Sequence, residues 1–163
     1  MYNFVSHSEK ETQEIAYKLA SKLQVGDIVV LSGEFGSGKT KFMEGFLSFW
    51  ELEKEISSPT FTIVNEHQKH STHIYHLDVY RLSDVGEFYS IGGPQYFYTG
   101  ICVIEWGELI ENILPPNYIK IRFSKDKHDE NTRYLDFASY GGRLETIIQS
   151  IILKDEFFDG ETV

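Results

Sequence analysis

Polar and apolar positions in the first fifty residues follow the periods of a strand, a helix, a second strand and a second helix. After a short strand at Tyr2–Val5, Ser8 and Glu11 have the spacing of a capping box, and apolar residues then recur every three or four positions. The β-branched run Ile28–Ser32, bounded by turn residues, predicts a buried strand. A glycine-rich loop and a second helix, which ends near Trp50, follow this strand.

The later pattern predicts shorter elements and a closing hairpin. In order they are strands at Phe61–Glu66 and His73–Tyr80 joined by a polar turn at Gln68–Ser71, a short helix at Asp84–Ser90, an irregular segment at Ile91–Thr99, a strand at Ile101–Ile104, a helix at Gly107–Leu114, a hairpin of Ile119–Phe123 and Arg133–Phe137, and a last helix at Arg143–Leu153. Strands that alternate with helices favour a parallel sheet covered by helices, and the hairpin adds strands of the opposite direction. We therefore predict a three-layer α/β fold with a mixed β-sheet flanked by helices.

Composition and charge exclude several classes of protein. Fifteen Lys and Arg against 25 Asp and Glu give a net charge of −10, so no direct strong nucleic-acid binding is expected and anionic membranes are disfavoured. The single cysteine, Cys102, cannot form an internal disulfide, and its apolar neighbours indicate a buried thiol. Without a signal peptide or a spanning apolar run, a cytoplasmic location is expected. Residues 1–163 form one predicted domain, with a flexible acidic tail from about 155 to 163.

The glycine-rich loop carries the most specific chemistry. Residues 33–40, here called the phosphate loop, read GEFGSGKT and match G-x-x-x-x-G-K-[ST] between a predicted strand and a predicted helix. Glycines let backbone N–H groups surround a phosphate, and a helix N-terminus favours anions. Lys39 is expected to contact the β- and γ-phosphates, and the Thr40 hydroxyl to hold Mg²⁺. The pattern predicts a nucleoside-phosphate site on a P-loop NTPase-like fold.

A phosphate loop also needs an acidic residue at the end of another buried strand. Glu105 directly follows the apolar run Ile101–Ile104, although a strand-end carboxylate that faces solvent has the same pattern. Asp78 has apolar neighbours on both sides, and its alternative role is an ion pair with Arg81 or a neighbouring lysine. Both acids are candidates for the metal or for the attacking water.

Two further residues have a functional and a structural interpretation. Thr60, in the loop Ser57–Phe61, is placed either to sense the γ-phosphate as a switch residue or to cap the following strand. Trp106 either covers a nucleotide or fills the core, and core packing is slightly favoured. Four histidines recur every third residue from His67 to His76, but on a strand–turn–strand segment this spacing alternates faces, so a metal cluster is not predicted.

Four blocks together resemble the TsaE family, also called YjeE, of small bacterial ATPases in tRNA threonylcarbamoyladenosine biosynthesis. In order they read GEFGSGKT, SSPTFTIVNEH, HLDVYRL and VIEWGELI, and the resemblance covers roughly residues 8 to 123. It implies Mg²⁺ at Thr40 and Glu105, a need for Asp78 in hydrolysis, a switch role for Thr60, and a nucleotide near Trp106. Lys39, Asp78 and Glu105 are thus the expected catalytic residues. The expected contacts of ATP or ADP are Glu34, Phe35, Gly36, Ser37, Gly38, Lys39, Thr40, Lys41 and Trp106.

The chain departs from the family pattern at three positions of this loop. Phe35 and Ser37 replace the usual Leu and Ala, and Lys41 stands where a second Thr is common. These positions are expected to contact the nucleotide through their backbone, so no phosphate contact is lost.

The resemblance implies a role beside two partners rather than on tRNA itself. In this family the ATPase joins a TsaB-type and a TsaD-type protein, and ATP hydrolysis supports repeated transfer of threonylcarbamoyl to tRNA by the TsaD-type partner. We expect Mg²⁺-dependent hydrolysis that is slow alone and faster with these partners. The alternatives are a small-molecule or nucleotide kinase, a GTP-dependent switch, and an assembly factor that holds nucleotide without turnover. The guanine-reading pattern Asn-Lys-x-Asp is absent, which disfavours the switch.

Overall fold

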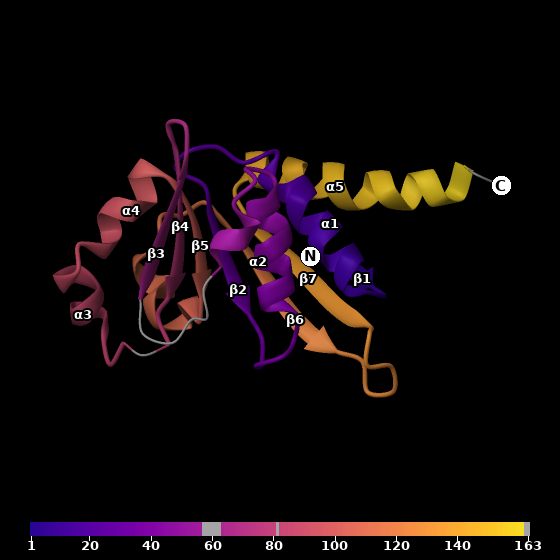
Figure 1. Ribbon diagram of the computed structural model, residues 1–163, viewed down its shortest axis with the longest axis horizontal. Helices are drawn as coiled ribbons and strands as arrows, with labels where there is room; N and C mark the ends of the chain where they lie inside the picture. The colour runs from indigo at the N-terminus through magenta and orange to yellow at the C-terminus, as the bar shows by residue number, and fades with distance from the viewer. Residues whose placement is uncertain (57–62, 81, 162–163) are drawn as a thin grey trace.

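Seven strands of the described residues form one sheet (Figure 1). The computed structural model describes residues 1–56, 63–80 and 82–161, with side chains up to Leu153 in the last helix. The strands are β1 (Tyr2–Ser6), β2 (Ile28–Ser32), β3 (Val64–Lys69), β4 (Thr72–Asp78), β5 (Ile101–Glu105), β6 (Tyr118–Lys125) and β7 (Arg133–Tyr140). The helices are α1 (Glu9–Ala20), α2 (Lys39–Ser48), α3 (Val85–Ser90), α4 (Gly93–Thr99) and α5 (Gly142–Glu161), with 3-10 helices η1 (Glu53–Glu55) and η2 (Gly107–Ile113).

The sheet is mixed, as the sequence predicts. Its strand order is β1-β7-β6-β2-β5-β4-β3. Strand β2 is parallel to both neighbours, β5 and β6, and β4 is parallel to β5. The pairs β1–β7, β6–β7 and β3–β4 are antiparallel. The carboxyl ends of β4, β5, β2 and β6 therefore meet at one edge, where open α/β sheets bind their ligands.

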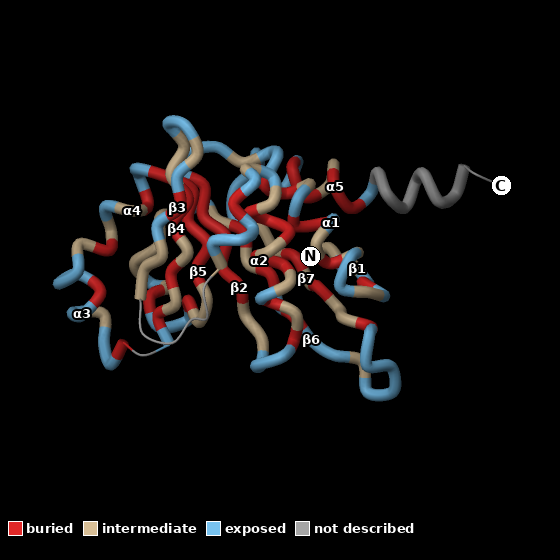
Figure 2. The backbone as a smooth tube through the Cα atoms, viewed as in Figure 1, coloured by how far each residue is buried: buried red, intermediate tan, exposed pale blue. Residues whose placement is uncertain are grey.

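Helices cover both faces, so the predicted three layers are confirmed. Along β2, Val29 and Leu31 pack with α1, α2 and α5, whereas Ile28 and Val30 pack on the opposite face with α3, α4 and η2. Figure 2 shows the buried backbone concentrated in the central strands. In Figure 1, α3 and α4 lie at the opposite end of the molecule from α5. None of the helices in the described ranges is both long and apolar enough to cross a membrane.

Several predicted elements differ from the structure. The segment 91–99 is not irregular, because Gly93–Thr99 forms α4. Pro94 lies in its first turn, where a missing N–H costs no helical hydrogen bond, and Gly92 precedes it with a left-handed φ of 75°. The β3–β4 turn is shorter than predicted and centres on His70, whose φ is 54°.

The predicted ends of other elements also shift. The predicted helix at 107–114 is the 3-10 helix η2, and β4 ends at Asp78. Helix α5 continues to Glu161 instead of ending near Leu153. The flexibility of the acidic tail stays a prediction. The capping box is confirmed in one of its two hydrogen bonds, since Ser8 Oγ accepts the Glu11 N–H at 3.1 Å. The Glu11 carboxylate accepts the N–H of His7 at 2.7 Å instead of the N–H of Ser8.

Helices α1 and α2 pack so closely that one position of α2 has room only for glycine. A Cβ on Gly45 would lie 2.2 Å from the carbonyl oxygen of Gln13 and 2.4 Å from its Cα. Neither atom can move without moving the backbone of α1. Because α2 begins at the end of the phosphate loop, this contact also fixes the position of the loop relative to α1.

We expect Gly45→Ala to lower the free energy of unfolding by about 1–3 kcal/mol, because the added methyl group forces the two helices apart. Gly142→Ala is the matched control, since a Cβ at Gly142, the first residue of α5, meets no atom within 4 Å. This control should change the free energy by less than about 1 kcal/mol. Urea denaturation measures both, and equal losses in the two variants would contradict the packing argument.

Candidate functional site

The phosphate loop leaves the carboxyl end of β2 at the centre of the sheet and enters α2 at Lys39. Its three glycines have left-handed φ values: 145° at Gly33, 78° at Gly36 and 111° at Gly38. Gly33 also lies against β6, because a Cβ there would be 2.7 Å from the carbonyl oxygen of Phe123. The loop therefore takes a conformation that side chains with a Cβ would disrupt.

Lys39 is buried where the loop meets the acidic strand ends. The residue is only 6% exposed, and its Nζ donates a hydrogen bond to the Gly33 carbonyl oxygen at 2.7 Å. Nζ also lies 4.1 Å from the centroid of the Trp106 ring, a cation–π distance. Burial lowers the pKa of Lys39, although the charges of Glu105 and Asp78 oppose that shift.

Asp78 and Glu105 end adjacent parallel strands and are paired in the β4–β5 register. Glu105 Oε2 lies 2.6 Å from Nε2 of His76. Burial would raise the pKa of Glu105, but the hydrogen bond and charge of His76, together with Lys39, outweigh it and lower the pKa. Asp78 Oδ1 accepts the backbone N–H of Tyr80 at 3.1 Å. The two carboxylates are therefore held at the edge where the phosphate loop lies.

A cavity of about 610 Å³ joins these groups. The predicted site residues that line it are Phe35, Gly36, Gly38, Lys39, Thr40, Lys41, Asp78, Glu105 and Trp106. Glu34 and Ser37 do not line it. Ser37 is buried, and its Oγ has no hydrogen-bond partner among the described residues. Thr60 and Arg81 lie outside the described residues.

Three aromatic rings contact one another at the phosphate loop. Trp106 lies 5.3 Å from Phe35 and 5.0 Å from Tyr80 between ring centroids, and Phe35 lies 5.8 Å from Tyr80. Phe35 is 70% exposed and Tyr80 57% exposed. Trp106 is the residue just before η2, has a left-handed φ of 61° and packs partly against the core. Trp106 thus packs against the core and also lies over Lys39, and its contact with a nucleotide stays a prediction.

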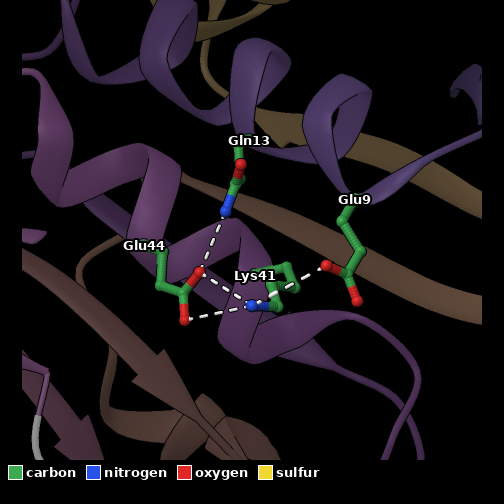
Figure 3. Close-up of polar contacts among 4 residues, drawn as sticks. All are labelled: Glu9, Gln13, Lys41 and Glu44. Carbon is green, nitrogen blue, oxygen red and sulfur yellow. Dashed lines mark hydrogen bonds and ion pairs between the residues drawn. The ribbon is translucent and has the colours of Figure 1, made fainter.

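Lys41 lines the cavity, but its ammonium group is held by carboxylates (Figure 3). Nζ lies 3.2 Å from Glu44 Oε2 and 3.8 Å from Glu9 Oε2, and the hydrogen bond and charge of Glu44 raise the pKa of Lys41. Gln13 of α1 donates to the same Glu44 carboxylate at 2.9 Å. The Lys41 ammonium group is therefore paired within the protein, and a backbone contact of Lys41 with a nucleotide stays a prediction.

The β6–β7 hairpin brings cations to the loop that the sequence pattern did not reveal. A Cβ on Gly36 would lie 3.1 Å from Nζ of Lys125, and one on Gly38 would lie 3.7 Å from Cγ of Arg133. Arg133 lines the cavity together with Glu130 and Asn131 of the same hairpin. The parallel pairing of β6 with β2 and the antiparallel return of β7 bring these side chains to the loop, and no local motif marks either pairing.

Three of the four histidines of the β3–β4 hairpin each contact a different glutamate. The pairs are His67–Glu55 at 3.1 Å, His73–Glu66 at 3.1 Å and His76–Glu105 at 2.6 Å. Of these three histidines, His76 lines the cavity. Its contact with Glu105 was not predicted, because it depends on the pairing of β4 with β5.

The oxygen atoms in the cavity suit Mg²⁺. Thr40 offers a hydroxyl group, and Asp78 and Glu105 offer carboxylates. Within the described ranges, no three His, Cys, Asp or Glu side chains form a complete metal cage. Mg²⁺ usually binds one or two carboxylates and takes its other ligands from substrate phosphates and water. The donor set therefore fits Mg²⁺ that arrives with a nucleotide.

Comparisons with known proteins agree on one family. The sequence model of threonylcarbamoyl adenosine biosynthesis protein TsaE matches residues 6–135. The tRNA threonylcarbamoyladenosine biosynthesis protein TsaE of Bacillus subtilis is 35% identical over 147 residues, 90% of each chain. The protein of the same name from Treponema pallidum is 39% identical over 118 residues, 72% of this chain and 87% of the relative. A crystal structure of Bacillus subtilis YdiB matches with a TM-score of 0.73 and 29% identity over 94% of this chain and 95% of that one.

We expect Gly33→Ala to weaken ATP binding at least about tenfold, because a Cβ there collides with β6 and with Ser37 Oγ, 2.9 Å away. Gly92→Ala is the control: it also places a Cβ at a positive φ, 75°, but no atom lies within 4 Å of the added Cβ. Gly92→Ala should lose about 1–2 kcal/mol of stability from its left-handed backbone alone, and Gly33→Ala should lose more, because the added Cβ also collides with β6. Titration calorimetry separates them, and wild-type ATP affinity in Gly33→Ala would refute this account of the loop.

Proposed function

The chain belongs to the TsaE family of threonylcarbamoyladenosine biosynthesis proteins, and we propose that it serves this pathway as a Mg²⁺-dependent ATPase. Its hydrolysis of ATP would sustain turnover of a complex of TsaB-type and TsaD-type proteins. One observation carries the proposal: a buried lysine, a threonine hydroxyl and two strand-end carboxylates line a single cavity at the phosphate loop. The four groups are Lys39, Thr40, Asp78 and Glu105.

In this proposal the phosphate loop and Lys39 bind the phosphates. The loop N–H groups and the N-terminus of α2 offer positive partial charge to the β-phosphate. Lys39 Nζ is within hydrogen-bond distance of the Gly33 carbonyl oxygen, so it already lies beside the loop and exchanges this oxygen for a phosphate oxygen. Trp106 limits access of water to Lys39, since its ring lies 4.1 Å from Nζ.

The two carboxylates take different roles in this proposal. Thr40 and Glu105 would hold Mg²⁺, which when bound supplies positive charge beside the β- and γ-phosphates. Asp78 orients the attacking water, and the Tyr80 N–H fixes the orientation of its carboxylate. Positioning and charge stabilisation account for most of the catalysis of phosphoryl transfer.

The cavity's cations support slow hydrolysis without a partner. The Lys41 ammonium is committed to Glu44 and Glu9. Among the described arginines, Arg133 lines the cavity, and its Nη1 donates to backbone carbonyl oxygens of Glu130 and Thr132 in its own hairpin. A partner would therefore complete the charge around the γ-phosphate. The net charge of −10 also fits a protein partner better than a direct contact with tRNA.

The first test is phosphate release from ATP, with and without the TsaB-type and TsaD-type partners. We expect release to rise when both partners are present and to vanish in Lys39→Ala, which loses the buried charge. Lys10→Ala, a change on the exposed side of α1 beside Glu14, serves as the control and should match wild type. Equal rates with and without partners would contradict the partner dependence. Tight ATP binding without release in either condition would indicate a nucleotide-gated assembly factor instead.

A second test separates binding from hydrolysis. Asp78→Asn keeps the size of the side chain and removes its charge, so ATP affinity should stay within about threefold of wild type. Phosphate release should fall about 100-fold or more, because the attacking water loses the carboxylate that orients it. Calorimetry and single-turnover kinetics measure the two effects. If affinity and rate fell together, Asp78 would be a binding residue rather than a catalytic one.

A further inference from the structure

His76 and Glu105 form a short hydrogen bond across the β4–β5 pair. His76 Nε2 lies 2.6 Å from Glu105 Oε2, and the two side chains are 12% and 14% exposed. His76 stands two residues before Asp78 on β4, so both side chains project from the same face of the sheet. All three line the cavity of the phosphate loop.

The direction of this hydrogen bond follows from the chemistry of its partners. An ionised carboxylate only accepts hydrogen bonds, so Nε2 of His76 is the donor. The bond engages Oε2 and leaves Oε1 of Glu105 for another partner. A glutamate has three rotatable side-chain bonds, and a nearly buried donor that grips one oxygen restricts them.

We propose that His76 is a positioning residue that fixes the Glu105 carboxylate in the orientation needed to bind Mg²⁺. This inference rests on the proposed function, because Glu105 is a metal ligand only if the site takes Mg²⁺ with a nucleotide. His76 acts through Glu105 and contacts neither nucleotide nor metal itself. Hydrogen-bond partners of this kind orient a ligating side chain, and their loss typically weakens metal binding about 10–100-fold.

A second His–Glu pair in the β3–β4 hairpin serves as the control for a purely structural role. His73 lies on the same strand and contacts Glu66 at 3.1 Å, but it does not line the cavity. If His–Glu pairs served only to join neighbouring strands, loss of either histidine would affect stability alone. Loss of His76 but not of His73 should instead change the response to Mg²⁺.

The experiment measures binding of a non-hydrolysable ATP analogue at increasing Mg²⁺ concentrations. His76→Gln keeps an amide N–H near the position of Nε2, whereas the side chain of His76→Asn is one methylene shorter and does not reach Oε2. We expect the Mg²⁺ concentration for half-maximal enhancement of binding to rise about tenfold in His76→Asn and to stay within about threefold of wild type in His76→Gln. Affinity without Mg²⁺ and the Mg²⁺ response of His73→Asn should both match wild type.

A double-mutant comparison tests whether His76 acts through Glu105. In a Glu105→Gln background, His76→Asn should cause no further change in the Mg²⁺ requirement, because the oriented carboxylate is already absent. An equal additional effect in that background would overturn the proposal. So would a wild-type Mg²⁺ requirement in His76→Asn. If His76→Asn does not fold, as judged by circular dichroism, His76→Met replaces it as a donor-free side chain of similar size.

The wild-type protein distinguishes this inference from the function on which it rests. If analogue binding to wild type does not respond to Mg²⁺, the proposed metal-dependent ATPase fails, and this inference fails with it. If wild type responds and His76→Asn responds equally, the proposed function stands and only the role of His76 is overturned.

Discussion

A buried ammonium group is the constraint on which the arrangement of this sheet edge depends. Lys39 lies among apolar and aromatic atoms, where an isolated charge is costly unless opposite charges and hydrogen-bond acceptors surround it. The parallel strands β4 and β5 satisfy this need, because their paired ends deliver Asp78 and Glu105 to the same place. The Gly33 carbonyl oxygen accepts one of the ammonium hydrogens. In the proposed function, bound phosphates would compete for a charge that the folded protein already keeps in place.

Local patterns were sufficient wherever one segment determines its own structure. Strand β2 has the predicted bounds, since its β-branched run lies between turn residues, and the phosphate loop follows it into a helix. The pattern failed at α4, where Gly92 and Pro94 indicated a break but instead start a helix, with Phe97 buried against the sheet. There tertiary packing decides the outcome.

In the candidate site too, the residues in local motifs were predicted, whereas the contacts that depend on strand pairing were not. Lys39, Thr40, Asp78 and Glu105 were predicted because each lies in a short motif or at the end of an apolar run, and the structure brings them to one cavity. The contact between His76 and Glu105 depends on strand register over 29 positions. The approach of the β6–β7 hairpin likewise depends on pairing that no local spacing encodes. Long-range geometry is therefore the part of the site that a single sequence conceals.

The contact between Gly33 and β6 has a consequence for folding and synthesis. The loop rests against the Phe123 carbonyl oxygen, and β6 pairs in parallel with β2, some ninety positions earlier in the chain. Pairing at such a sequence separation forms late and slowly, since a long loop must close first. A nascent chain that has emerged only as far as β5 carries the complete GEFGSGKT motif without the strand that supports it. If the chain binds nucleotide as proposed, tight binding is expected only once the polypeptide is nearly finished, and a bound nucleotide would stabilise the completed fold through the same late contact.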